Sequence, residues 1–342
     1  MEELMKDRIR GCLVGLAVGD ALGMPVETMS PSAIRLATNG HGVNGYLAPI
    51  QRRIEDTRGL PPGSWTDDTQ LTLAVARSLV RANGFDLRDQ ADELVSEWRR
   101  TTFGWGGTTA HSARELDERR RLPDDPAPMP IKPGDGCGNG VAMRISPLAV
   151  WCYAVRDLTE TEPFLTWTMR LGLMTHGDPR ASLAAIAIGT AVGAALHLPE
   201  RRVPAENVRF AVYRLVDRFV RLAEERWANY RPSSELLSER LRVAERHLAD
   251  PLLLRRAVGT GCFALQSVPF AIGTFLRRPY SFRAAVLEAV NAGGDADTTA
   301  SMVGAMCGAT VGLGGIPENL VAGLHDANRI LKAADELIEA IG

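Results

Sequence analysis

The sequence contains few of the features that mark secreted, membrane-bound or nucleic-acid-binding proteins. Its five cysteines, at positions 12, 137, 152, 262 and 307, form no CxxC pair and no metal-ligand spacing. We therefore expect reduced, buried thiols in a reducing compartment. The formal net charge is −2, with acidic and basic residues interspersed, which predicts no nucleic-acid partner and no anionic membrane surface as a partner.

A clear targeting segment is also missing. The only N-terminal candidate is GCLVGLAVG, which follows Lys6, Arg8 and Arg10 and ends before Asp20. It is far shorter than the ~20 apolar residues that a membrane-spanning helix needs. Glu2 and Glu3 precede it, whereas a signal peptide begins with positive charge. These features predict a soluble, cytoplasmic protein.

The alternation of apolar and polar residues that marks β-strands is absent as well. Apolar residues instead recur at intervals of three and four, as in Leu71, Val75 and Leu79, which is the period of a helix. The chain has 342 residues, 45% of them hydrophobic, enough for a sizeable core. We predict an all-α fold in a single domain over 1–342. The predicted helices lie near 4–21, 68–82, 88–100, 108–120, 141–155, 163–173, 179–196, 205–227, 234–248, 251–256, 260–276, 281–290, 297–312 and 317–340.

Three connections between these helices are rich in glycine and proline. They cover 22–65, 121–140 and 291–296. Long ordered loops in compact helical domains are usually functional, so we expect these segments to shape a site.

Glycines recur every fourth residue in two of the predicted helices. Gly11, Gly15, Gly19 and Gly23 share one face of the first helix, and Gly304, Gly308 and Gly312 repeat the pattern near the C-terminus. Such spacing lets two backbones approach closely. We predict that these two helices cross tightly at the centre of the fold.

Two short acidic runs open helices and contain the residues best suited to chemistry. They are Thr66-Asp67-Asp68 and Asp295-Ala296-Asp297-Thr298. An Asp or Thr before a helix is often only an N-cap, but capping explains one carboxylate per helix and leaves a surplus in each run. Carboxylate and hydroxyl oxygens are hard ligands that suit Mg²⁺, Mn²⁺ or Ca²⁺. From spacing alone, a cap and a metal site are equally good interpretations.

Two known acidic motifs do not fit the second run. Residues 295–299 match the DxDxT pattern of haloacid-dehalogenase-type phosphatases, but that motif follows a buried strand, and here Asn291-Ala-Gly-Gly294 precedes it. A calcium-binding EF-hand loop needs Gly at its sixth position and Glu at its twelfth. Those positions hold Ala300 and Met306. If the four carboxylates converge, they cannot all stay ionised without compensation, and a pair of divalent cations would supply it.

Several blocks of the sequence, in order, resemble the ADP-ribosylglycohydrolase family. They are GCLVGLAVGDALGMPVE at 11–27, WTDDTQLTLAVARSL at 65–79, GNGVAMRISPLAV at 138–150, THGD at 175–178 and AVNAGGDADTTASMVGAMCGATVGLGGIP at 289–317. The resemblance extends through most of the chain, so it is far more specific than any one block.

The resemblance implies a roughly orthogonal all-α fold with two Mg²⁺ or Mn²⁺ ions in a cleft. It implies metal ligands at Thr66, Asp67, Asp68, Asp295, Asp297 and Thr298, a mobile Glu27 beside them, and a cleft for ADP-ribose lined by Gly138, Asn139, Gly140, Met143, Arg144 and His176. Considered alone, Glu27 would be a solvated loop residue and His176 a turn residue. Arg144 is expected to form a salt bridge or carbonyl bonds, and Trp65 and Trp105 either core contacts or a stack on a base.

The activity implied by the resemblance is hydrolysis of the glycosidic bond between ADP-ribose and an acceptor, N-linked or O-linked. Glu27 is the implied acid/base, with Asp67 or Asp295 as the alternative base. The partner would be an ADP-ribosylated protein, on Arg or Ser, or a small-molecule conjugate, with ADP-ribose as product and the enzyme a monomer or small homo-oligomer. A non-catalytic ADP-ribose-binding or structural relative is the alternative, and a phosphatase is a third candidate. Relatives of the nitrogenase-regulating type carry an Asp where this chain has Gly104-Trp105, so the acceptor stays open.

Overall fold

The structure, a computed structural model, describes residues 1–50, 59–101, 103–128, 136–156, 158, 161–199, 203–228 and 235–342. These residues form sixteen α-helices and, apart from one isolated bridge between Gly138 and Phe263, no β-structure. The predicted all-α class is therefore confirmed. Parts of the predicted loops, at 51–58, 102 and 129–135, and the first residue of the helix predicted at 234–248, lie outside the described residues.

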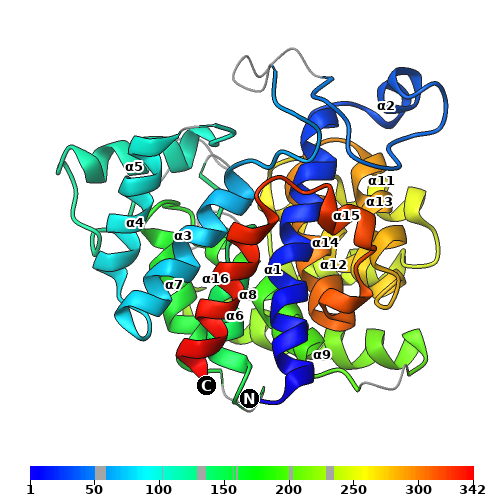
Figure 1. Ribbon diagram of the computed structural model, residues 1–342. Coiled ribbons are helices and arrows are strands. Elements are labelled where there is room, and N and C mark those ends of the chain that lie inside the picture. The colour runs from blue at the N-terminus through cyan, green and yellow to red at the C-terminus, as the bar shows by residue number, and fades with distance from the viewer. Residues whose placement is uncertain are drawn as a thin grey trace.

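The helices follow one another along the whole chain, in the order drawn in Figure 1. They are α1 (Glu3–Gly23), η1 (Met24–Val26), α2 (Pro31–Ala37), α3 (Asp67–Ala82), α4 (Leu87–Arg100), α5 (Gly107–Asp117), α6 (Ser146–Tyr153), α7 (Phe164–Leu173), α8 (Pro179–Leu196), α9 (Ala205–Arg226), α10 (Leu237–Arg246), α11 (Pro251–Val258), α12 (Ala264–Arg277), α13 (Phe282–Ala292), α14 (Ala296–Val311), η4 (Leu313–Gly315), α15 (Glu318–Ala322) and α16 (Ala327–Ile341).

Helices α1 and α14 form the centre of the fold and pack backbone to backbone through their glycines. A Cβ atom on Gly15 would lie 2.4 Å from the carbonyl oxygen of Gly304, and one on Gly304 would lie 2.0 Å from that of Gly15. No side chain fits at such a distance, so only glycine permits this crossing. The tight crossing predicted from the glycine spacing is confirmed.

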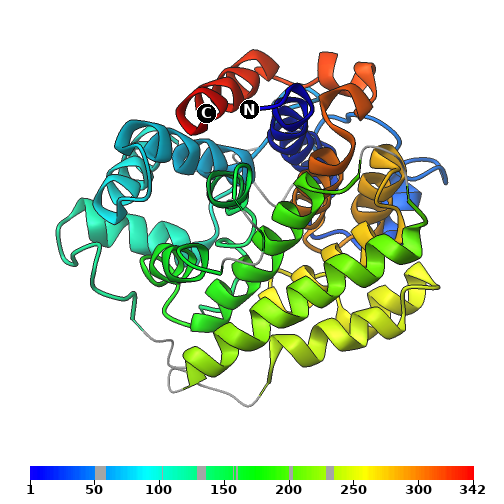
Figure 2. The same cartoon turned by 90° about the horizontal axis from the view of Figure 1, so that it is seen from below.

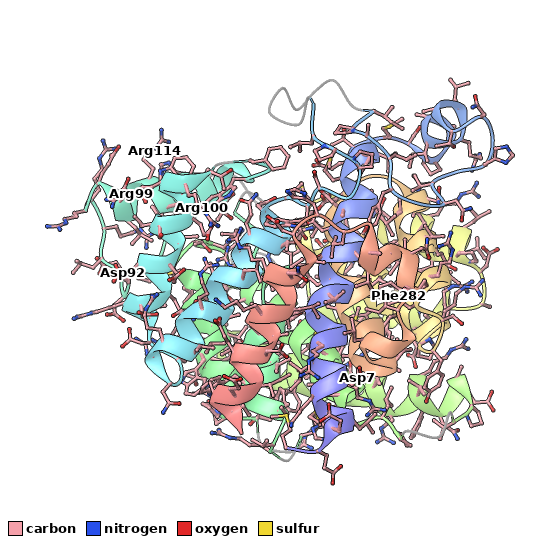
Figure 3. The ribbon with its side chains drawn as sticks, in the orientation of Figure 1. Asp7, Asp92, Arg99, Arg100, Arg114 and Phe282 are labelled. Atoms are coloured by element: carbon pink, nitrogen blue, oxygen red, sulfur yellow. The ribbon has the colours of Figure 1, made fainter. Side chains whose placement is uncertain are left out.

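The other helices surround this central pair. In Figure 1, α16 lies on one flank of α1 with α3, α4 and α5 beyond it, while α12 and α13 lie on the other flank against α14. Figure 2 shows α8 and α9 crossing the opposite side, with the two chain termini close together. Figure 3 shows Arg99, Arg100 and Arg114 on the outer side of α4 and α5.

Two helices are long and apolar enough to span a membrane by length and composition alone. They are the segment Glu3–Val26, which joins α1 to η1, and α8. Within the structure, 94% and 100% of their most apolar windows are buried against other helices. Their place in the protein core therefore accounts for their apolar composition.

Three predicted boundaries were wrong for local reasons. The helix predicted at 317–340 is two helices, because the chain turns between Gly323 and Asp326, and Asp326 has a left-handed backbone with φ of 51°. The helix predicted at 141–155 begins only at Ser146, since 141–144 form turns. The predicted loop 22–65 contains the short helix α2, which Ser30 caps by accepting a hydrogen bond from the amide of Ala33.

Candidate metal and ligand site

Glu27 is held beside the start of α14 by a pair of backbone hydrogen bonds. The amide of Thr28 donates to the carbonyl of Gly294, and the amide of Gly294 donates to the carbonyl of Met29. Gly293 has φ of 66°, and a Cβ there would lie 2.3 Å from the carbonyl oxygen of Met29. The glycine at 293 is therefore what lets this acidic loop pack against the segment that carries Glu27.

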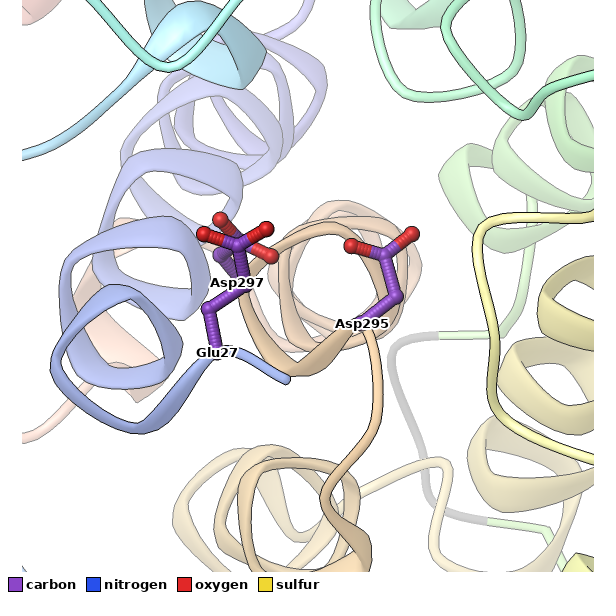
Figure 4. A group of neighbouring side chains, drawn as sticks. All are labelled: Glu27, Asp295 and Asp297. Atoms are coloured by element: carbon purple, nitrogen blue, oxygen red, sulfur yellow. The ribbon is translucent and has the colours of Figure 1, made fainter. Parts of the chain in front are cut away.

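Three carboxylates converge at this point. Oxygen atoms of Glu27, Asp295 and Asp297 all lie within 4.8 Å of one another. Figure 4 shows their side chains directed to the same side of the N-terminus of α14. Asp297 is buried and Glu27 is partly buried, so the group is a pocket of acids and not a solvated surface cluster.

The first acidic run is oriented by a residue that the sequence analysis did not select, Asp20. The carboxylate of this fully buried residue accepts hydrogen bonds from the amide and hydroxyl of Thr66 and from the amide and hydroxyl of Thr69. Asp20 on α1 therefore caps α3 from outside. The acids of the run, Asp67 and Asp68, are therefore not needed to cap α3.

The two acidic runs meet in the structure. The hydroxyl of Thr298 donates to Oδ2 of Asp68 at 3.2 Å, although the two residues are 230 positions apart. Oδ1 of Asp68 is buried and has no hydrogen-bond partner in the part of the chain that the structure describes. Asp295 is the N-cap residue of α14, yet its side chain makes no capping bond. The simple cap interpretation therefore does not account for these acids.

The electrostatics of the group require compensation by protons or cations. Burial, reinforced by the charges of Asp295 and Asp20, raises the pKa of Glu27 to about 7. Burial also raises the pKa of Asp67 and Asp297 well above the ordinary range, and neighbouring acids add to the effect. Carboxylates that raise one another's pKa in this way are typical of sites that hold a divalent cation when loaded.

The residues present fit such a cation. The donor set consists of carboxylate and hydroxyl oxygens, the ligands that Mg²⁺ and Mn²⁺ prefer. The unpartnered Oδ1 of Asp68 is a buried acceptor that a metal or its water would satisfy. The hydroxyl of Thr66 donates its proton to Asp20 at 2.9 Å, which leaves its lone pairs available to a cation.

A cleft of about 280 Å³ opens above the acids. One wall is the N-terminus of α5, where Gly106, Gly107, Thr108 and Thr109 line the space. A helix N-terminus carries partial positive charge and unpaired N–H groups, so this wall suits an anionic ligand. A larger hollow of about 650 Å³ lies along α9, and all the residues that line it belong to that helix.

The predicted loop Gly138-Asn139-Gly140 forms the opposite wall of the cleft. The side-chain amide of Asn139 donates to Oδ2 of Asp295 at 2.5 Å and to Oγ of Ser267 at 3.1 Å. This loop therefore holds one of the acids as well as lining the cleft. Its backbone is tied in turn to the segment before α12, because the amide of Asn139 donates to the carbonyl of Cys262.

The THGD block supports this wall from below. Asp178 caps α8 and forms a buried ion pair with Arg180 at 2.6 Å. The guanidinium of Arg180 lies over the ring of Phe263, 5.7 Å from its centroid, and Phe263 forms the isolated bridge with Gly138. A buried ion pair thus fixes the position of a glycine in the cleft.

Other predicted residues divide between the cleft and the core. His176 and Met143 line the cleft. Arg144 is buried but forms neither the expected salt bridge nor a carbonyl bond within the described residues, because its guanidinium donates to the hydroxyl of Thr175 instead. The indole of Trp65 donates to the carbonyl of His325, and that of Trp105 donates to the side chain of Gln70. Neither tryptophan is among the residues that line the cleft.

Sequence reasoning missed three parts of the site. Asp20 was noted only as the end of an apolar run, although an acid inside a glycine-spaced helix was a usable signal. The α5 wall gave a weaker signal, the repeated glycines of 104–107. Cys262 also lines the cleft; it is exposed, so the prediction of buried thiols is wrong for this cysteine and confirmed for the other four.

The comparisons with known proteins agree with this geometry. The family model described as ADP-ribosylglycohydrolase matches residues 1–342. The chain belongs to the ADP-ribosylglycohydrolase family. The predicted resemblance is thus confirmed across the full sequence.

Relatives of this ADP-ribosylglycohydrolase family member come from different organisms. ADP-ribosylhydrolase ARH3 of Mus musculus is 27% identical, over 91% of this chain and 86% of the relative. ADP-ribosyl-[dinitrogen reductase] glycohydrolase of Rhodospirillum rubrum is 28% identical, over 93% and 90%. A solved structure titled "ADP-ribosylglycohydrolase-related protein complex" superposes with a TM-score of 0.71 at 27% identity and covers 100% of both chains.

Proposed function

We propose that this protein is a divalent-metal-dependent hydrolase that cleaves the glycosidic bond between ADP-ribose and an acceptor. The observation that supports this proposal is the convergence of Glu27, Asp295 and Asp297 within 4.8 Å, beside a cleft that ends in a helix N-terminus. The names of the relatives, which are hydrolases of ADP-ribosylated substrates, agree with the chemistry of that arrangement.

Two Mg²⁺ or Mn²⁺ ions would be held by the oxygens of Thr66, Asp67, Asp68, Asp295, Asp297 and Thr298. A bound divalent cation at this place supplies Lewis acidity and orients hydroxyl groups. Asp20 and Asn139 keep two of these residues in position, since Asp20 accepts from Thr66 and Asn139 donates to Asp295.

Glu27 is the proposed acid/base. In the metal-free protein its pKa is raised to about 7, by burial first and by Asp295 and Asp20 second, and a carboxyl of raised pKa is the usual acid/base in such sites. Asp67 and Asp295 remain the alternative bases. The α5 N-terminus and the 138–140 loop would bind the diphosphate, so that the ribose next to the acceptor lies above the acids.

The acceptor residue is proposed as Arg, Ser or a small-molecule O-linked group. Gly104 lies beside the site with φ of 80°, and a Cβ there would be 2.8 Å from Oδ1 of Asp67. A side chain here would strain the backbone and displace Asp67, and with glycine at 104 the cleft lacks the Asp that the arginine-specific pattern has there. This observation favours O-linked conjugates over ADP-ribosyl-arginine.

The proposal is tested with a panel of ADP-ribosyl-arginine, ADP-ribosyl-serine and O-acetyl-ADP-ribose, with and without Mg²⁺ or Mn²⁺. Release of ADP-ribose is followed by chromatography, and ADP-ribose binding by calorimetry. Metal-dependent release from at least one conjugate is expected. Binding of ADP-ribose without release from any conjugate would favour the non-catalytic alternative, and release that persists in EDTA would contradict the metal site.

A further inference from the structure

Beneath the cleft lies a buried chain of three polar side chains that the proposed chemistry does not use. Arg144, Thr175 and His176 are 2%, 0% and 2% exposed. Nη2 of Arg144 donates to Oγ1 of Thr175 at 2.7 Å, and Oγ1 of Thr175 lies 2.9 Å from Nδ1 of His176. The chain therefore connects a buried cation to the imidazole on the wall of the cleft.

Arg144 occupies this place with little other support. Its Nη1 is buried without a partner among the described residues, and Arg144 lines a small space together with mostly apolar residues such as Leu71, Leu94 and Met174. Burial lowers the pKa of Arg144 to about 10, and the charge of Asp67 opposes this shift. A guanidinium buried without a carboxylate partner is unfavourable for folding, which indicates that its single bond to Thr175 serves the site.

The direction of the hydrogen bonds follows from the chemistry of the groups. Arginine can only donate, so the hydroxyl of Thr175 accepts from Arg144 and has one proton of its own to give. Two acceptors compete for this proton, Nδ1 of His176 at 2.9 Å and the carbonyl of Gly172 at 3.4 Å. The second distance is long for an O–H donor, so the proton belongs to the bond with Nδ1.

We propose that Arg144 and Thr175 are positioning residues that fix His176 as the tautomer with its proton on Nε2, aimed into the cleft as a neutral hydrogen-bond donor. Burial, with the charge of Arg144 as the second cause, lowers the pKa of His176 to about 3, so the ring carries a single proton. Nδ1 accepts from Thr175, and that proton is therefore on Nε2.

The Nε2 edge of the ring lies next to the glycines of the 138–140 loop. A Cβ on Gly140 would lie 3.1 Å from Cε1 and 3.3 Å from Nε2 of His176, and one on Gly138 would lie 3.5 Å from Nε2. The donor thus opens onto the space between the two glycines. The ligand group that it suits is an oxygen acceptor, a phosphoryl or hydroxyl oxygen, and only this assignment of the ligand rests on the proposed function.

The test uses ¹⁵N-labelled histidine in the full-length protein, with the resonances of His176 assigned by a His176→Gln variant. The wild type is expected to show a protonated Nε2 and an unprotonated, hydrogen-bonded Nδ1. Thr175→Ser keeps the hydroxyl and should preserve this pattern. Thr175→Val has the same shape without the hydroxyl, and its Nδ1 resonance should move to the value of a free ring nitrogen.

Binding gives a second readout. Thr175→Val should weaken ADP-ribose binding by about three- to tenfold, the value of one net hydrogen bond, while Thr175→Ser stays near the wild type. A proton on Nδ1 in the wild type, or an Nδ1 resonance unchanged in Thr175→Val, would overturn the proposal. If the tautomer is as expected and ADP-ribose does not bind to the wild type, the proposed function fails while the positioning role stands.

Discussion

At the residue scale, the site depends on a few side chains that hold the acids where they are. Asp20 binds both the backbone and hydroxyl groups of Thr66, and Asn139 donates to Asp295. Not every carboxylate oxygen of the acids is hydrogen-bonded, since Oδ1 of Asp68 has no partner among the described residues. Replacing an acid and replacing a residue that holds it in place should therefore affect activity and stability differently.

Asp297→Asn tests an acid directly. The change keeps the shape of the side chain but removes a carboxyl whose pKa is raised by burial first and by the charges of Glu27 and Asp295 second. Activity should fall by more than about 100-fold, above the loss seen for an outer-shell partner of a metal site. In EDTA the melting temperature should stay the same or rise, because repulsion is relieved. A melting temperature that still increases with Mg²⁺ as in the wild type would contradict the role of Asp297 as a ligand.

Gly104→Ala tests the close approach beside Asp67. The residue has φ of 80°, and the added Cβ would lie 2.9 Å from Cβ of Thr66. The strain should lower the free energy of unfolding by about 1–3 kcal/mol, measured by urea denaturation. Gly45→Ala is the matched control, because nothing lies within 4 Å of its added Cβ. Equal stability of the two variants would show that the 104 position is not constrained.

At the scale of elements, the crossing of α1 and α14 brings the two halves of the site together. Asp20 lies near the C-terminus of α1, and Glu27 directly follows the short helix η1 that comes after it. Asp297 lies in the first turn of α14. The glycine spacing of four made this crossing predictable from the sequence. The turn at 323–326, which divides the predicted helix 317–340, was not predictable, because Asp326 adopts a left-handed backbone without glycine.

Gly19→Ala tests the crossing. Its Cβ would lie 2.1 Å from the carbonyl oxygen of Ala300, and a backbone atom cannot move aside as a flexible side chain can. The free energy of unfolding should fall by about 3 kcal/mol or more, at the upper end for overpacking. Gly107→Ala in α5 meets nothing within 4 Å and serves as the control for stability. A Gly19→Ala protein as stable as the control would contradict the close packing of α1 against α14.

The candidate site was predictable in its acids and less so in its surroundings. The surplus of carboxylates in both runs indicated a purpose beyond capping, and Thr298 does contact Asp68 across the two runs. The supports could not be read from the sequence, because they depend on which helices pack together. Arg144 illustrates this limit. Its place in an apolar block predicts a carboxylate or carbonyl partner, but in the structure its guanidinium donates to the hydroxyl of Thr175.

At the scale of the whole molecule, stability is linked to the protonation of the acid cluster. Folding raises the pKa of Asp20 to about 6 and that of Glu27 to about 7, with burial as the main cause. A carboxyl whose pKa is raised on folding stabilises the native state below its unfolded pKa, and this stability is lost as pH rises through the folded value.

The prediction of one domain over 1–342 stays a prediction.

The metal-free protein should therefore melt at a lower temperature as pH rises from about 4 to 7. Calorimetry in EDTA across this range measures the effect. Mg²⁺ should remove most of the dependence near pH 7, because a cation takes over the role of the protons. Stability in EDTA that rises steadily over the same pH range would show that the acids are not buried together.

The central claim, that 66–68 and 295–298 form one metal-dependent hydrolytic site, is tested most directly by measuring ADP-ribose release from an ADP-ribosylated substrate during a titration with Mg²⁺ after treatment with EDTA. Release by the wild type should be absent in EDTA and return with added Mg²⁺. Release by Asp68→Asn and by Asp297→Asn should stay low throughout, one variant from each acidic run. Full activity of either variant, or undiminished wild-type release in EDTA, would contradict the account.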